Sequence, residues 1–203
     1  MNYDEIYDEE YYLRYVVCPE DQDNVEQGYY HKLMENVHQA ITSEALNLLG
    51  PKTLLDVGCA FNYAVKFARD VYDIEAWGVD VSSYAYTHSS CPDYHVLADC
   101  SKPLDFDGKL FELVMCIEVA EHLTEEDSHG LLNNLTNLSS KYILFSSDSV
   151  SEMALAEPTH INMQPESYWI KQFEKRGFVK YEHFVPPEYI PHSILLLNKE
   201  ILK

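Results

Sequence analysis

The sequence predicts an α/β fold in a single domain, in which strands and helices alternate. Three observations support this prediction. The short apolar run Thr53-Leu54-Leu55-Asp56-Val57 leads into Gly58, as a buried parallel strand does before a tight turn and a helix. Further strand-like runs follow, and several of them end in an acidic residue. The chain has 203 residues, 46% of them hydrophobic, which is enough for one domain with a core and too few for two.

The composition argues against several classes of protein. Acidic residues outnumber basic residues by 34 to 14, which gives a formal net charge of −20. This charge repels phosphate backbones and anionic membranes, so nucleic acid is a disfavoured partner. No stretch approaches the roughly 20 apolar residues that span a bilayer, and the acidic start does not resemble a signal peptide. We therefore expect a cytoplasmic protein without membrane contact.

The first 26 residues combine charge with aromatic side chains. They carry nine acids, one base and five tyrosines. Charge favours disorder, whereas tyrosines bury surface readily. We expect residues 1–34 to form an acidic, tyrosine-rich cap on a domain that spans residues 35–203. A frayed acidic tail is the alternative.

The expected elements follow in order along the chain. A helix over residues 28–49 has apolar residues at helical spacing and stops at Gly50-Pro51, and we expect it to pack in the core without chemistry of its own. The first strand leads through its turn into a helix over 64–71. Further strands are expected over 75–80, 94–98, 110–117 and 142–147, followed by a helix over 166–176 that places Trp169 in the core or beside a substrate.

Acidic residues end four successive strands: Asp56, Asp80, Asp99 and Glu118. The carboxyl ends of parallel strands meet at one edge of a sheet, where open α/β sheets form their ligand crevices. The turn at Gly58 is either a nucleotide-type cofactor loop or an ordinary turn after a buried strand. Asp80 favours the cofactor loop, because a carboxylate 22 residues beyond this glycine can accept hydrogen bonds from ribose hydroxyls.

A series of motifs resembles that of class I S-adenosylmethionine (SAM)-dependent methyltransferases. The motifs are Leu55-Asp56-Val57-Gly58-Cys59, Gly78-Val79-Asp80-Val81-Ser82, Ala98-Asp99 and Cys116-Ile117-Glu118-Val119-Ala120-Glu121-His122-Leu123. The resemblance covers roughly residues 35–200, and the series is more specific than any single motif. It implies a Rossmann-like, seven-stranded sheet, mostly parallel with an antiparallel last strand, and helices on both faces. Residues 179–184 and 193–198 would supply the closing hairpin.

The resemblance also implies a site for SAM. Asp56, Gly58 and Cys59 would lie at the methionine part, Asp80 at the ribose, and Asp99 and Cys100 at the adenine, while Val81 and Ile117 complete the expected cofactor-binding set. The family usually has glycines at the positions of Ala60 and Asn62. Asn tolerates a left-handed backbone well and Ala adds only a methyl group, so we expect the turn to survive. Weakened cofactor binding is the alternative.

The segment from Glu118 to His122 carries candidate metal ligands. A helical turn after the fourth strand would bring Glu118, Glu121 and His122 to one face, and His160 follows the fifth strand at the same edge. Carboxylates and imidazoles suit a divalent cation such as Mg²⁺. The set resembles that of metal-assisted O-methyltransferases, including ubiquinone-pathway enzymes and small-RNA 2′-O-methyltransferases. The alternative is that Glu121 and His122 only orient the helix beneath the cofactor.

Methyl transfer requires an aligned acceptor and a group that takes its proton, because the sulfonium is already activated. Imidazole has a pKa suited to this role, so His122 and His160 are the candidate catalytic residues. We expect the other histidines, His192 among them, at the surface or in packing.

These inferences predict an enzyme, a SAM-dependent methyltransferase that acts on a hydroxyl of a small molecule such as a sugar or a secondary metabolite. N-methylation of a small molecule is the chemical alternative. A non-catalytic, methyltransferase-like protein-interaction module is the alternative from another class. A nicotinamide-dependent enzyme is a third reading, but the chain lacks a GxGxxG motif. The expected partner is a small-molecule acceptor, and a homodimer is left open.

Overall fold

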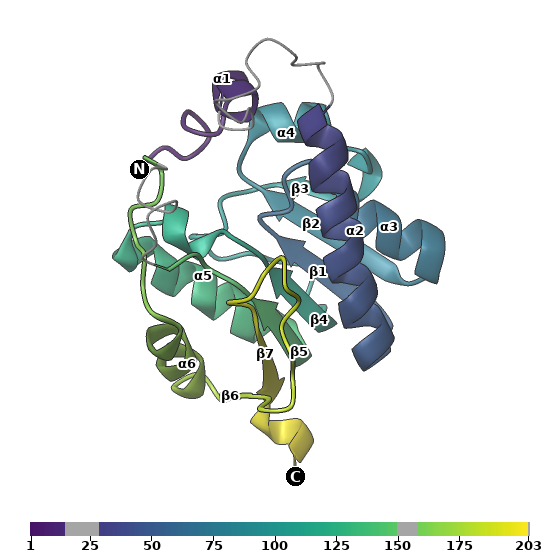
Figure 1. The fold of residues 1–203 in the computed structure, drawn as a ribbon, viewed down its shortest axis with the longest axis vertical. Coiled ribbons are helices and arrows are strands. Elements are labelled where there is room, and N and C mark those ends of the chain that lie inside the picture. The colour runs from purple at the N-terminus through teal and green to yellow at the C-terminus, as the bar shows by residue number, and fades with distance from the viewer. Residues whose placement is uncertain (15–28, 150–157, 203) are drawn as a thin grey trace.

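Seven strands form one sheet at the centre of the computed structural model, which describes residues 1–14, 29–149 and 158–202 (Figure 1). The strands are β1 (Thr53–Val57), β2 (Glu75–Asp80), β3 (His95–Leu97), β4 (Phe111–Cys116), β5 (Ser139–Phe145), β6 (Phe178–Lys180) and β7 (Ile194–Asn198). Their order is β3-β2-β1-β4-β5-β7-β6. Strand β7 is antiparallel to both neighbours, and the pairs among β1 to β5 are parallel. The predicted α/β class and the mostly parallel, Rossmann-like sheet are confirmed.

Helices cover both faces of this sheet. They are α1 (Glu9–Arg14), α2 (Tyr29–Leu49), α3 (Tyr63–Tyr72), α4 (Ser83–Thr87), α5 (Glu125–Leu138) and α6 (Glu166–Glu174), and short 3₁₀ helices occur at Pro92–Tyr94, Ala120–His122 and Lys199–Leu202. Buried side chains of α2 and α3 form one core with one face of the sheet. Those of α5 and α6 form a second core with the other face. No described helix has the length and apolar character needed to cross a bilayer.

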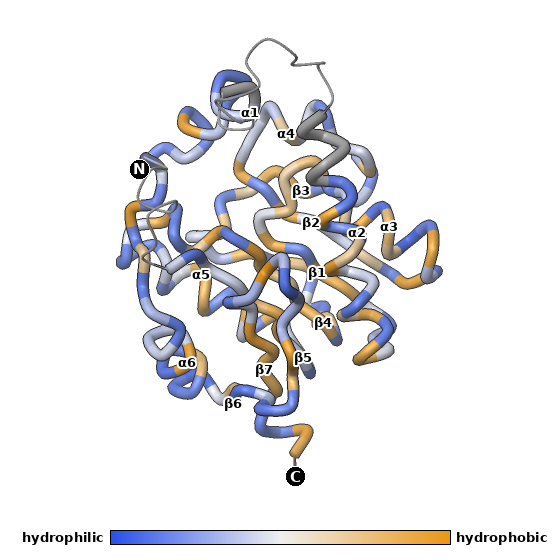
Figure 2. The backbone as a smooth tube through the Cα atoms, in the orientation of Figure 1, coloured by the Kyte–Doolittle hydropathy of each residue, from blue (hydrophilic) through white to orange (hydrophobic). Residues whose placement is uncertain are grey.

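The two cores explain the sequence of the central strands. Four of the five residues of β1 and five of the six residues of β4 are buried. Because helices cover both faces, such strands are continuous apolar runs instead of alternating patterns. Figure 2 shows this apolar character along β4 and β7.

Some strand ends differ from the expected ones. Strand β4 stops at Cys116, short of residue 117, and Glu118 then takes a left-handed conformation with φ of 55°. Strand β5 begins at Ser139, three residues before the expected start, because this residue pairs with Phe111 of β4. Strand β6 covers Phe178–Lys180 and not 179–184, since a turn closed by the Phe184 N–H and the Tyr181 carbonyl follows it.

The described part of the expected cap, residues 1–14, is fastened to the domain. The Tyr3 hydroxyl donates to the Asp127 carboxylate of α5 at 2.7 Å. Where α4 begins, the Ser83 N–H donates to the Asp4 carboxylate at 2.7 Å. The remainder of the expected cap includes residues 15–28, which lie outside the described residues, and its expected boundary at 34 falls inside α2.

Candidate active site

A cavity of about 370 Å³ lies at the carboxyl ends of the parallel strands. The segments that follow β1, β2, β3 and β4 line it, as the acidic strand ends predict. Six of the eight expected cofactor residues are among its lining residues: Gly58, Asp80, Val81, Asp99, Cys100 and Ile117. These six residues lie at the edge of the sheet where the sequence predicts the cofactor.

The two other expected cofactor residues, Asp56 and Cys59, are buried beneath the cavity. The Cys59 thiol lies 3.5 Å from Nε2 of His95 on β3, so its side chain is directed into the sheet. Asp56 is only 2% exposed, and its Oδ2 has no hydrogen-bond partner in the described part of the chain. Burial, reinforced by the charge of Asp80, raises the pKa of Asp56 to about 7.

The turn after β1 keeps a left-handed backbone at the three positions that the family usually fills with glycine. The φ angles are 81° at Gly58, 44° at Ala60 and 64° at Asn62. A Cβ atom on Gly58 would lie 2.3 Å from Cγ2 of Val119, so this glycine is required. The Asn62 side-chain amide donates to the carbonyls of Cys91 and Tyr94, and these hydrogen bonds offset the cost of its left-handed backbone. The expectation that the turn survives is confirmed, with a strain of about 1 kcal/mol at Ala60.

The carboxylate of Asp80 is fixed by this turn. Its Oδ2 accepts the Ala60 N–H and its Oδ1 accepts the Ser82 N–H, both at 2.8 Å. Burial raises the pKa of Asp80, and these backbone hydrogen bonds oppose the shift. A carboxylate has about four lone-pair positions, so Asp80, which lines the cavity, has capacity left for a further donor.

Residues outside the expected motifs complete the wall of the cavity. Tyr3, Tyr7, Tyr11 and Tyr12 come from the N-terminal segment, and Val37, His38 and Ile41 come from α2, the helix expected to have only a packing role. The Tyr7 and His122 rings pack edge to face, with 5.7 Å between their centroids. Among the described residues, the lining includes Asp80, Asp99 and Glu118 and no lysine or arginine. The cavity is therefore electronegative.

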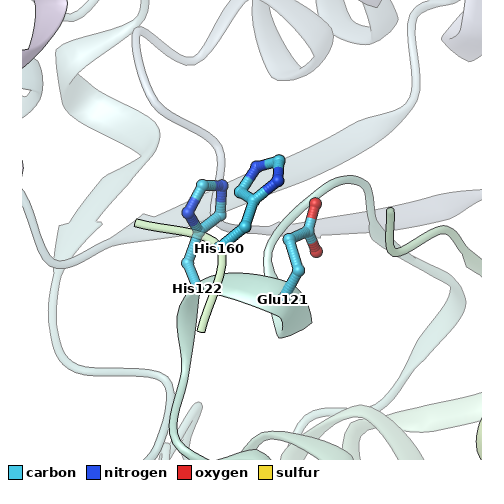
Figure 3. A group of neighbouring side chains, drawn as sticks. All are labelled: Glu121, His122 and His160. Carbon is cyan, nitrogen blue, oxygen red and sulfur yellow. The ribbon is translucent and has the colours of Figure 1, made fainter. Parts of the chain in front are cut away.

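Glu121, His122 and His160 lie close together (Figure 3), and of the three His122 lines the cavity. One ligand atom from each lies within 4.8 Å of the others, and the two imidazole rings are 4.7 Å apart. The segment around His160 is held there because the N–H groups of Ile161 and Asn162 donate to the Glu121 carbonyl. The Thr159 hydroxyl lies 2.9 Å from Nδ1 of His122 and orients that ring.

The Glu121 carboxylate is the unusual member of this group. It is 0% exposed, and neither oxygen has a hydrogen-bond partner in the described part of the chain. Burial and the nearby charge of Glu118 raise its pKa well above the usual range. Burial lowers the pKa of His122 to about 4, so its imidazole is neutral at neutral pH. A neutral imidazole can ligate a metal but is a weak base.

Glu118, the fourth expected ligand, is not part of this group. Its Oε1 lies 2.7 Å from Nε2 of His192, in the segment before β7. Glu118 has a positive φ and is not helical, and the 3₁₀ helix starts only at Ala120. The helical spacing expected between Glu118, Glu121 and His122 therefore does not hold. The hydrogen bond that His192 donates to the Glu118 carboxylate raises the pKa of His192. His192 lines the cavity, contrary to its expected surface or packing role.

A family model described as a methyltransferase domain matches residues 27–183. The chain belongs to this methyltransferase family. The match covers most of the chain and includes all four motifs, so the expected class, a class I SAM-dependent methyltransferase with SAM as its cofactor, is confirmed. No curated protein matches the sequence.

Solved methyltransferase structures share the fold of this chain at low sequence identity. A putative methyltransferase in complex with the Trm112 activator of Haloferax volcanii is 14% identical, with a TM-score of 0.64 over 83% of this chain and 92% of the other. Magnesium protoporphyrin IX methyltransferase from Synechocystis PCC 6803 is 14% identical, with a TM-score of 0.60 and 81% coverage of both chains. A SAM-dependent methyltransferase from Archaeoglobus fulgidus is 17% identical, with a TM-score of 0.58 over 83% and 98%.

Proposed function

We propose that this methyltransferase transfers the methyl group of SAM to a hydroxyl of a small molecule such as a sugar or a secondary metabolite. The proposal includes a divalent cation held by Glu121, His122 and His160. One observation carries it: a fully buried carboxylate, without a hydrogen-bond partner among the described residues, lies beside two imidazoles, one of which lines the cofactor cavity. Buried polar groups are nearly always paired, and a cation would provide the missing partner.

The cavity residues fit SAM in the proposed roles. Gly58 allows the backbone to approach the ligand closely, and the remaining acceptor capacity of Asp80 suits a ribose hydroxyl. Asp99 and Cys100 would lie at the adenine, with Val81 and Ile117 packing beside the cofactor. The electronegative lining favours SAM, whose sulfonium and ammonium give it a net positive charge.

The ligand group fits a cation in the same way. Glu121 offers a carboxyl oxygen that a bound cation would hold in its anionic form, and Thr159 orients the neutral His122 imidazole. A bound divalent cation lowers the pKa of a hydroxyl that it coordinates. We therefore assign His122 and His160 their catalytic role as ligands. A cytoplasmic location and a homodimer remain predictions.

N-methylation is the second candidate, and the cavity lining favours it. The tyrosine rings and the carboxylates of Asp80, Asp99 and Glu118 can bind a cationic amine through cation–π and ionic contacts. An amine acceptor has no requirement for a metal, because its nitrogen is already nucleophilic once it is neutral.

The test is methyl transfer from SAM to matched pairs of acceptors that differ only in a hydroxyl or an amine. Release of S-adenosylhomocysteine and the mass of the product would be measured with added Mn²⁺ and with a chelator. We expect methylation of a hydroxyl that depends on the cation. Methylation of the amine alone, unaffected by the chelator, would favour the second candidate and refute the first.

A further inference from the structure

A second cavity, of about 320 Å³, lies between the end of β5, α6 and the segment before β7. Ser147, Glu166, Trp169 and Pro191 are among its lining residues, and none of the expected cofactor residues is. His192 lines this cavity and also the cofactor cavity. The two cavities therefore adjoin at one imidazole, whose Nε2 is held by Glu118.

Two residues that line the second cavity each carry a buried polar atom without a hydrogen-bond partner among the described residues. The atoms are Oγ of Ser147, a residue that is 5% exposed, and Nε1 of Trp169, a residue that is 2% exposed. The Trp169 ring itself is core, since it packs 5.4 Å from the Phe145 ring. An indole N–H and a hydroxyl left unpaired in the interior destabilise the fold. A ligand in the cavity that hydrogen-bonds to both atoms would remove this cost.

The lining defines the chemistry of this ligand. Phe145, Trp169 and Pro191 offer apolar surface, whereas Ser147 and the Trp169 N–H offer hydrogen bonds. The described lining includes no lysine or arginine, and its carboxylate, Glu166, is paired with Lys180, so the cavity has no lysine or arginine to bind an anionic group. An uncharged ring that bears hydroxyls has both the apolar face and the hydrogen-bonding groups that this cavity requires.

We propose that the second cavity binds the methyl acceptor, and that the acceptor is an uncharged, hydroxylated ring. Ser147 and the Trp169 indole N–H bind its hydroxyls, and His192 stands between the acceptor and the methyl donor. This assignment rests on the proposed function and names its substrate class and site. It also explains the two environments of Trp169: its ring packs in the core, and its N–H donates a hydrogen bond to the ligand.

The Trp169 indole N–H gives a direct measurement of binding. The chain has two tryptophans, and the Trp77 indole lies beside Glu75 outside both cavities, so it is an internal control in the same ¹H–¹⁵N spectrum. The probes are methyl β-D-glucopyranoside and catechol, with glucose 6-phosphate as the anionic counterpart. We expect a saturable shift of the Trp169 resonance with at least one neutral probe and none with the phosphate. Unchanged Trp169 with both neutral probes, or equal shifts with the phosphate, would overturn the proposal.

Ser147→Ala separates a binding role from a structural one. Removing an unpaired buried hydroxyl should leave the stability unchanged or higher, yet weaken binding of the neutral probe by a factor of about three to ten. Ser139→Ala, at the opposite end of β5, removes a hydroxyl that donates to the Tyr142 carbonyl and should leave probe binding unchanged. Equal probe binding by Ser147→Ala and the native chain would contradict the assignment. SAM binding is measured separately, so that failure of the acceptor site and failure of the methyltransferase function can be told apart.

Discussion

Replacing Glu121 by glutamine should abolish binding of Mn²⁺ to the group that it forms with His122 and His160. Glu121 is the only carboxylate among the three described ligands, and neither of its oxygens has a hydrogen-bond partner in the described part of the chain. Loss of this anionic ligand should weaken Mn²⁺ affinity by a factor of about 100 or more. The metal-free variant should be more stable than the native chain by about 1–3 kcal/mol, because burial forces this carboxyl either to stay charged or to take up a proton, and a neutral amide avoids both costs.

Both effects can be measured on the purified proteins. Mn²⁺ affinity is obtained from the electron paramagnetic resonance signal of the free ion, and stability from denaturant unfolding in the presence of a chelator. The matched control is Glu126→Gln, the same change at an exposed position of α5. Native Mn²⁺ affinity in Glu121→Gln would refute the ligand assignment. A loss of stability in the metal-free variant would instead mark Glu121 as a structural residue.

Replacing Asp56 by asparagine should stabilise the protein at pH 8 and reduce the pH dependence of its stability. The folded chain holds the pKa of this carboxyl at about 7, whereas its ordinary value is 3.8. The folded state therefore binds more protons than the unfolded state between these values. Stability is lost as the pH rises from about 4 through about 7, and a shift of this size corresponds to at most about 4 kcal/mol. Asparagine has nearly the same shape and no charge, so it removes this loss.

Unfolding by urea at a series of pH values measures the effect. Asp93→Asn, at an exposed position, is the control and should follow the native curve. The native and Asp56→Asn curves should diverge as the pH rises and run parallel above about pH 8. If the Asp56→Asn curve falls with the native one between pH 4 and 7, the buried carboxyl is not the group responsible.

Elements with a strong local signal could be predicted from the sequence. Strand β2 has the expected bounds, and Asp80 lies at its end with its carboxylate fixed at the cavity. The left-handed turn persists at Ala60 and Asn62 because hydrogen bonds of its own stabilise it. These features depend on a few residues that are close together in the sequence, so a sequence pattern can predict them.

Several contacts of the site could not be predicted. Glu118 was expected to join Glu121 and His122, but its positive φ breaks the helical spacing on which that expectation depended. Its partner, His192, is 74 residues away and has no motif around it. The tyrosines of the N-terminal segment and the α2 residues reach the cavity only through the packing of the whole domain. No local pattern carries this information.

Calorimetric titration of the purified protein with SAM tests most directly whether the cavity holds the cofactor. We expect micromolar binding to the native chain. Asp80→Asn should weaken it by a factor of about 10 or more, since it removes the charge that accepts the ribose hydroxyls. No heat of binding, with or without Mn²⁺, would contradict the cofactor site and point to a methyltransferase-like module that binds protein partners.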